Sequence, residues 1–260
     1  MLPEPVERVA TGAAGTGLEW GVANINADDV WQEYGRRSED IIIANIDTGV
    51  QFDHPALRAS YRGTNADGTV THDYNWLDTS ANCKGGAPCD THGHDTHTMG
   101  TMAGDDGHGN QIGVAPGVKW IAANGCQICS EENLVASAQW MLAPTDSQDQ
   151  NPDVSKRPHI INNSWSSTVP TDEPIIEDIL EAWAASGIMG IWANGNNGPS
   201  CKTCGSPGSR TLNYSVAPTT PATRSPPSPA AAPARTARPS RTSLRRASTC
   251  ARRCPAAPTA

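Results

Sequence analysis

The sequence predicts an α/β fold, a doubly wound parallel sheet with helices on both faces. Two observations carry this prediction. Short apolar runs, the first of them rich in β-branched residues, alternate along the chain with segments whose apolar residues follow helical spacing. The first of these runs stops at Asp47-Thr48-Gly49, a turn sequence. Alternation of this kind favours parallel strands joined by helical crossovers that cover both faces of the sheet.

Four segments are predicted to be buried strands: residues 41–46, 119–123, 159–163 and 188–193. Two helices are predicted between them. Ser130 can cap the first, while Pro174 opens the second and Gly187 stops it. The apolar positions are Leu134, Ala138, Met141 and Leu142 in the first helix and Ile176, Ile179, Leu180 and Trp183 in the second.

Charge is divided unevenly along the 260 residues. Residues 1–216 hold all 27 acidic side chains and 11 Lys or Arg, a net charge of −16. Residues 217–260 hold eight Arg, no acid and, apart from Leu244, no large apolar side chain. Such a composition cannot form a core, so we expect a disordered Ala/Pro/Arg-rich tail after a folded unit at 19–216. Residues 1–18 are expected to be a leader or propeptide remnant.

No apolar run approaches the roughly 20 residues that a membrane helix needs. The first residues, Met-Leu-Pro-Glu-Pro, show no charged-then-apolar signal pattern. The sequence therefore predicts neither a membrane-spanning protein nor a signal peptide in this chain.

Six of the eight cysteines fall in close pairs: Cys83/Cys89, Cys126/Cys129 and Cys201/Cys204. Loop-closing disulfides and zinc ligands both fit such pairs. A zinc site usually joins two close CxxC pairs, whereas 71 residues separate Cys129 from Cys201. This spacing favours disulfides, and with them an oxidising compartment.

Ligands of a parallel sheet lie beyond the carboxyl ends of its strands, so the residues that follow each strand are the candidates for chemistry. Asp47 follows the first predicted strand, and Asn196 lies in a Gly-rich loop after the last. His94 opens a small-residue segment that reads as a helix. Taken singly, each is more simply a turn, cap or surface residue. Taken together, the three polar residues lie where one cleft can form.

At these positions the sequence resembles the subtilisin-like serine proteases, the subtilases, and within them the bacillopeptidase F-like branch. IANIDTGV at 43–50 is similar to the catalytic-aspartate motif, and HDTHTMGTMAG at 94–104 to the catalytic-histidine motif. NNSW at 162–165 resembles the substrate-binding strand, and ANGNNGPSC at 193–201 the oxyanion loop. The resemblance runs in family order from about Glu19 to Val216 and implies a subtilisin-like fold, here truncated before its last elements.

The resemblance also implies a role for each residue. Asp47 orients and stabilises the His94 imidazolium, and His94 is the general base and then the general acid. The Asn196 side-chain amide donates to the oxyanion of the tetrahedral intermediate. Ser164, Trp165, Ser166 and Gly195 form the substrate-binding set, in which the peptide is held as an added strand.

Three positions depart from the family pattern. Asp95 stands where the motif has Gly, so its carboxylate is expected either to pair with His94 or to crowd the backbone. Ser166 replaces a Gly and is expected to narrow the cleft. Ala56 replaces an acidic residue that helps to bind a structural calcium in relatives. Asp105, Asp106 and Asn110 can still hold calcium, although a solvated acidic loop is the simpler interpretation.

The family nucleophile is a serine in a Gly-Thr-Ser-Met-Ala-like segment, and no such string follows Asn196 in this sequence. The tail suggests a reason. TRSPPSPAAAP at 223–233 can be encoded by codons that read DAIASFSSRGP when one base is supplied before them. SRTSLRRASTCARRCPA at 240–256 permits KPDVAAPGVDVRSSVPG at the same offset. Both readings resemble subtilase strings, so we expect the tail to be out of frame from about Ala217.

The sequence therefore predicts a serine endopeptidase that lacks its nucleophilic serine and is inactive as written. Its expected partners are protein or peptide substrates, with no nucleic acid and no membrane, and we expect a secreted monomer. The chemistry requires no cofactor. Two alternatives remain. His92, His94 and His97 nearly form a zinc-hydrolase motif, and the basic tail would suit a non-enzymatic binder of anionic surfaces.

Overall fold

The computed structural model describes residues 17–168, 174–197, 203–210, 214–217 and 245–246. Their centre is a sheet with the strand order β2-β3-β1-β4-β5-β6-β7. All neighbours are parallel except β6 and β7. The strands are β1 (Ile42–Asp47), β2 (Trp76–Asp78), β3 (Lys119–Asn124), β4 (Ile160–Asn163), β5 (Met189–Ala193), β6 (Tyr214–Val216) and β7 (Arg245–Arg246). The four predicted strands are confirmed as β1, β3, β4 and β5.

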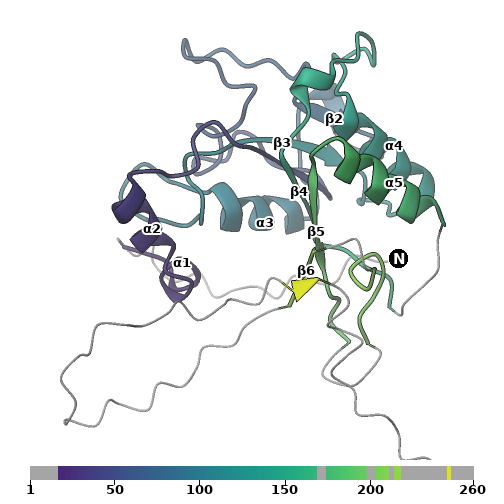
Figure 1. Ribbon diagram of the computed structural model, residues 1–260. Helices are drawn as coiled ribbons and strands as arrows, with labels where there is room; N and C mark the ends of the chain where they lie inside the picture. The colour runs from purple at the N-terminus through teal and green to yellow at the C-terminus, as the bar shows by residue number, and fades with distance from the viewer. Residues whose placement is uncertain (1–16, 169–173, 198–202, 211–213, 218–244, 247–260) are drawn as a thin grey trace, which may run out of the picture.

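Helices cover the sheet on both sides (Figure 1). They are α1 (Trp20–Asn24), α2 (Ala27–Tyr34), α3 (His94–Ala103), α4 (Glu131–Leu142) and α5 (Pro174–Ala185), with short 3-10 turns at Lys84–Gly86 and Val154–Lys156. The predicted signals at helix ends are confirmed. Ser130 Oγ accepts from the Asn133 amide at 3.2 Å, and Gly187 follows α5 with a φ of +78°.

Alternate residues of β1 enter two separate cores. Ala44 and Ile46 pack in the cluster that contains Met141 of α4 and Trp183 of α5. Ile43 packs in the other cluster, which includes Met99 of α3. Because successive side chains of a strand point to opposite faces, α3 covers one face of the sheet while α4 and α5 cover the other. This arrangement confirms the predicted doubly wound α/β fold.

The two predicted terminal segments, 1–18 and 217–260, lie mostly outside the described residues. At the amino-terminal limit, Leu18 already forms a β-bridge with Gln111. In the tail, Arg245 and Arg246 form β7, while 218–244 and 247–260 lie outside the described residues, so a disordered tail stays a prediction. Among the helices that are described, none is long and apolar enough to cross a membrane.

Candidate active site

Asp47 is the last residue of β1, the central strand between β3 and β4, and its side chain is buried. The chain then turns sharply at Gly49, whose φ is +92°. A Cβ at position 49 would lie 2.2 Å from the Cys89 carbonyl oxygen. The turn therefore requires glycine both for its positive φ and for this close approach of the backbone. The turn leaves the Asp47 carboxylate at the carboxyl edge of the sheet, where parallel sheets bind their ligands.

His94 is the first residue of α3 and meets this carboxylate. Its Nδ1 lies 2.9 Å from Asp47 Oδ1, which also accepts from the Thr48 amide at 2.8 Å. The His94 side chain is 25% exposed and that of Asp47 only 3%. The hydrogen bond to Asp47 raises the pKa of His94 against the opposing effect of burial. Burial raises the pKa of Asp47, while the hydrogen bonds from His94 and Thr48 oppose that rise.

A second carboxylate, Asp90, fixes the start of α3. Its Oδ1 accepts from the Thr48 hydroxyl at 3.1 Å and from the amides of His92 and Gly93 at 3.0 and 2.7 Å. Its Oδ2 accepts from the amide and hydroxyl of Thr96 at 2.9 and 2.7 Å. Asp90 therefore joins the first turn of α3 to the residue after Asp47 and sets the relative position of Asp47 and His94.

Asp95 corrects the sequence analysis. Its side chain is fully buried in the contact between α3 and β1, and its Oδ1 accepts from Asn45 Nδ2. The expectation that Asp95 pairs with His94 is wrong, because Asp95 Oδ1 is bonded to Asn45, Asp95 Oδ2 has no hydrogen-bond partner among the described residues, and His94 Nδ1 is bonded to Asp47. Burial, followed by the charge of Asp47, raises the pKa of Asp95 well above its usual value.

The predicted substrate-binding segment follows β4. Trp165 turns inward, where its Nε1 donates to the Ile46 carbonyl at 2.9 Å and its ring meets Trp192 edge to face. Ser166 lies against the loop after β5. A Cβ at Gly195, whose φ is +83°, would be 2.9 Å from Ser166 Oγ. The Ser166 side chain therefore occupies the space beside Gly195. Ser164 makes a separate contact, in which its Oγ accepts from Asn162 Nδ2 at 2.9 Å.

Asn196 is exposed on the loop that follows β5. Because β5 runs parallel to β1, this loop leaves the sheet at the same edge as Asp47. The neighbouring Asn197 donates from Nδ2 to the Thr168 carbonyl at 2.8 Å and so connects the loop to the chain two residues beyond Ser166. Residues 198–202 lie outside the described part of the chain.

Two of the three cysteine pairs are joined as disulfides, Cys83–Cys89 and Cys126–Cys129. Both lie beside the Asp47 turn: Cys89 precedes Asp90, and the Cys126 amide donates to the Asp47 carbonyl at 2.9 Å. Cys204 is buried, with its Sγ 3.4 Å from Asn194 Oδ1. Its predicted partner Cys201 lies outside the described residues, so the third disulfide stays a prediction.

In the acidic loop that was predicted as a possible calcium site, the carboxylates accept hydrogen bonds from backbone amides of the same loop. Asp105 accepts from the Gly107 amide at 2.9 Å, and Asp106 accepts from the amides of His108 and Asn110. Across the described ranges, no group of three or more His, Cys, Asp or Glu side chains is arranged to hold a metal ion. The zinc alternative built on His92, His94 and His97 therefore gains no support from the arrangement of these side chains.

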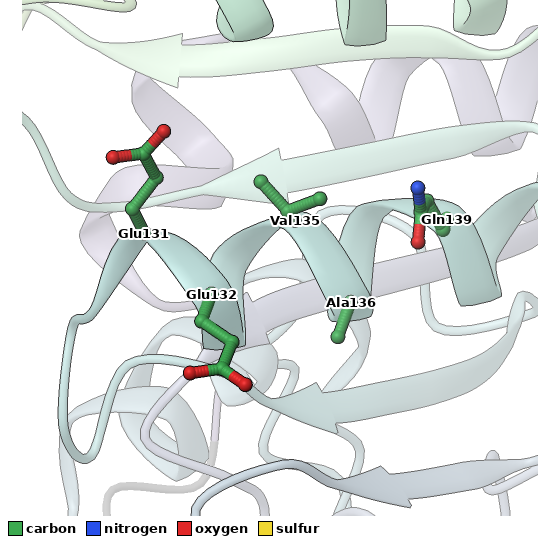
Figure 2. A pocket seen from close by; sticks show the side chains of 5 residues that line it. All are labelled: Glu131, Glu132, Val135, Ala136 and Gln139. Carbon is green, nitrogen blue, oxygen red and sulfur yellow. The ribbon is translucent and has the colours of Figure 1, made fainter.

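A hollow of about 540 Å³ runs along the outer face of α4 (Figure 2). It is lined by Glu131, Glu132, Val135, Ala136 and Gln139. This helix covers the sheet face opposite to α3, so the hollow is separate from the Asp47–His94 pair.

Sequence reasoning did not identify Asp90, Thr48 and Thr96 as parts of the site. The available signal was an Asp shortly before a predicted helix, which is typical of a residue that caps the first turn. Asn45 was also missed, because a polar residue in a buried strand is conspicuous only when its partner is known.

A family model described as the subtilase family matches residues 38–243. The chain is 36% identical to Bacillopeptidase F of Bacillus subtilis (strain 168) over 214 residues, which are 80% of this chain and 14% of that protein. It is 30% identical to the Minor extracellular protease Vpr of the same organism over 203 residues, 75% of this chain and 22% of Vpr.

A third relative is the Major intracellular serine protease of Bacillus subtilis (strain 168). The identity is 27% over 181 residues, which are 70% of this chain and 50% of that protein. The chain thus spans half or less of the length of these three relatives. One of the three is named extracellular and another intracellular.

Proposed function

The chain belongs to the subtilase family, and on this premise we propose that it is the amino-terminal part of the catalytic domain of a serine endopeptidase that hydrolyses peptide bonds in proteins. The observation that carries the proposal is the 2.9 Å contact between Asp47 Oδ1 and His94 Nδ1 at the carboxyl edge of the sheet. A buried carboxylate on one imidazole nitrogen leaves the other nitrogen available to a nucleophile.

His94 supplies the proton transfers in this proposal. With Nδ1–H donated to Asp47, the neutral imidazole keeps its lone pair on Nε2 and can accept the proton of a serine hydroxyl. The resulting imidazolium is stabilised by the Asp47 carboxylate and later protonates the leaving amine. Only neutral His94 can act as the base, so activity rises with pH through the His94 pKa, which Asp47 raises.

The two loops at the same edge hold the substrate and its transition state. We assign the oxyanion donor to the Asn196 side-chain amide and the backbone contacts of the peptide to 164–166 and Gly195. Removal of a donor of this kind costs roughly 10²–10³ in kcat, a magnitude the general principle draws from subtilisin itself. Ser166 beside Gly195 supports a narrowed cleft, which would favour small substrate side chains there.

The nucleophile is the missing part of the proposal. No Gly-Thr-Ser segment follows Asn196, and the serines of the tail stand among Pro, Ala, Thr and Arg. We infer that the reading frame is displaced near Ala217 and that the serine is encoded further on in the shifted frame. The chain as written is then inactive, because loss of a triad member leaves only roughly 10³–10⁴-fold acceleration over water.

We also propose a cellular location, an oligomeric state and partners for the enzyme. The joined pairs Cys83–Cys89 and Cys126–Cys129 support an oxidising, extracytoplasmic location. We propose a monomer that acts on protein or peptide substrates without a cofactor in the chemistry. A structural calcium at the Asp105–Asp106 loop would share these carboxylates with the backbone amides of Gly107 and His108.

Casein hydrolysis tests the proposal. The chain as written, a form with one base restored near codon 217, and the restored form carrying His94→Ala are compared. We expect background hydrolysis from the first, measurable kcat/KM from the second, and a loss of several orders of magnitude in the third. Proteolysis that persists in His94→Ala would overturn the triad, and a restored frame without a Gly-Thr-Ser segment would overturn the displaced frame.

A further inference from the structure

Asp95 and Asn45 form a polar pair inside the contact between α3 and β1, where the mechanism assigns no role to either. Both side chains have no exposed surface. Asn45 Nδ2 donates to Asp95 Oδ1 and to Thr98 Oγ1, the latter at 3.0 Å. The pair lies two residues before Asp47 on the strand and one residue after His94 on the helix.

The second oxygen of the Asp95 carboxyl group and the amide oxygen of Asn45 make no hydrogen bond to the described residues. These two atoms, Asp95 Oδ2 and Asn45 Oδ1, are both buried. If Asp95 is ionised, both atoms are acceptors and no donor serves either. Buried acceptors without a partner cost about 1–3 kcal/mol each, and an unpaired buried charge costs more.

The surrounding charges do not compensate an Asp95 carboxylate. Asp47 on β1 and Asp90 on the loop before α3 are the charged groups that act on it, and both are acidic. His94, the adjacent residue, gives its Nδ1 to Asp47. An ionised Asp95 would therefore be a third negative charge, buried and without a cation.

We propose that Asp95 is a neutral carboxylic acid in the folded protein, with its Oδ2 hydroxyl donating to Asn45 Oδ1 while its Oδ1 accepts from Asn45 Nδ2. A primary amide and a carboxylic acid are complementary, since each offers one donor and one acceptor on neighbouring atoms. One proton thus satisfies both remaining oxygens and removes the buried charge.

Asp95 is then a positioning residue for the site. The neutral pair ties the helix that carries His94 to the strand that carries Asp47, and it keeps a further negative charge away from the Asp47 carboxylate. This positioning role rests on the proposed function, whereas the protonation of Asp95 does not. A raised pKa of Asp95, caused by burial and by the charge of Asp47, agrees with the proposal.

The proposal fixes how stability depends on pH. In the unfolded chain an Asp titrates near its ordinary pKa of about 3.9, so above that pH unfolding releases the Asp95 proton. The stability that Asp95 contributes is complete at low pH and is lost as the pH rises from about 4 through the raised folded pKa. Asp95→Asn keeps the shape and a donor but cannot titrate.

Unfolding by urea between pH 5 and 7 tests the inference in the full chain, with Asp95→Asn and, as control, the exposed Asp149→Asn. We expect the unfolding constant of the wild type, relative to Asp95→Asn, to rise about tenfold per pH unit, as release of one proton requires. The ratio of the unfolding constants of the wild type and Asp149→Asn should not change with pH. If the ratio of the unfolding constants of the wild type and Asp95→Asn is also independent of pH, Asp95 is ionised in the folded protein and the proposal is overturned.

A second measurement does not depend on the stability of a variant. The infrared spectrum of the wild-type chain with ¹³C-labelled aspartate should show a protonated carboxyl band at pH 7, and the band should be lost in Asp95→Asn or Asp95→Gly. Absence of the band in the wild type overturns the proposal, as does a band of unchanged intensity in either variant. Neither measurement uses peptidase activity, so their failure would leave the proposed function standing.

Discussion

Asp47 is buried, with 2% of the whole residue exposed, and its Oδ1 accepts hydrogen bonds from both Thr48 and His94. A carboxylate in this position is useful because it favours one tautomer of His94 and stabilises its protonated form. The same interaction links the site to folding. Because the pKa of His94 is raised, its contribution to stability is complete below about pH 6.5, its unfolded value, and is lost as the pH rises through the folded pKa.

Replacing Asp47 by Asn should therefore lower the pKa of His94, because the charge and the acceptor oxygen that favour the imidazolium are removed. The measurement is the NMR titration of the His94 ring proton in the chain as written, with Asp149→Asn as the control of equal charge change. A His94 midpoint that is the same in Asp47→Asn and in the wild type would contradict the pairing.

Asp90 should matter more for stability than its position in a loop suggests. It accepts five hydrogen bonds from Thr48, His92, Gly93 and Thr96. We expect Asp90→Ala to reduce the free energy of unfolding by about 2–4 kcal/mol, since several donors lose a charged acceptor. The matched control is Asp106→Ala, which breaks two backbone contacts in a surface loop. Similar losses in the two variants, measured by urea unfolding, would contradict this role.

At the scale of elements, the disulfide Cys83–Cys89 closes the loop that presents Asp90. The two cysteines are six residues apart in sequence, and the Cys89 carbonyl lies against the Gly49 turn. Replacing both cysteines by Ser should lower stability by about 2 kcal/mol, the value that chain entropy gives for a loop of this length. The test is urea unfolding of the double variant, and an unchanged transition midpoint would show that the loop is held without the disulfide.

The elements that the sequence predicted well are those with a strong local pattern. β1 is rich in β-branched Ile, β3 is apolar from Trp120 to Ala123, and α4 has both a cap at Ser130 and helical spacing. The three-residue strand β2 has no such pattern, because it is defined by pairing with β3 46 residues further on, as between Trp76 and Ala122. A local pattern cannot predict a pairing of that range.

The same limit applies to the site. Asp47 and His94 were predicted because each stands in a motif, and the structure joins them by a hydrogen bond. The partner of Asp95 was not predicted, because Asn45 is 50 residues away and lies in a buried strand. Contacts between a helix and a strand are set by packing, which neighbouring residues in the sequence do not reveal.

Across the whole molecule, the charge and composition of the chain change near Ala217. The acidic part up to that residue builds both cores of the doubly wound sheet and the Asp47–His94 pair. The basic part after it is rich in Ala, Pro and Arg and contains no Gly-Thr-Ser segment. We propose that Asp47 and His94 are two members of a triad whose serine is encoded in the other reading frame.

Covalent labelling by a fluorophosphonate tests for this triad, since the reagent reacts with a serine only when a neighbouring base activates it. We predict no labelling of the chain as written, labelling of one serine in a Gly-Thr-Ser segment of the frame-restored protein, and loss of that labelling in the restored His94→Ala variant. Labelling of any serine in the chain as written, or equal labelling of the restored protein with and without His94, would show that Asp47 and His94 are not members of such a triad.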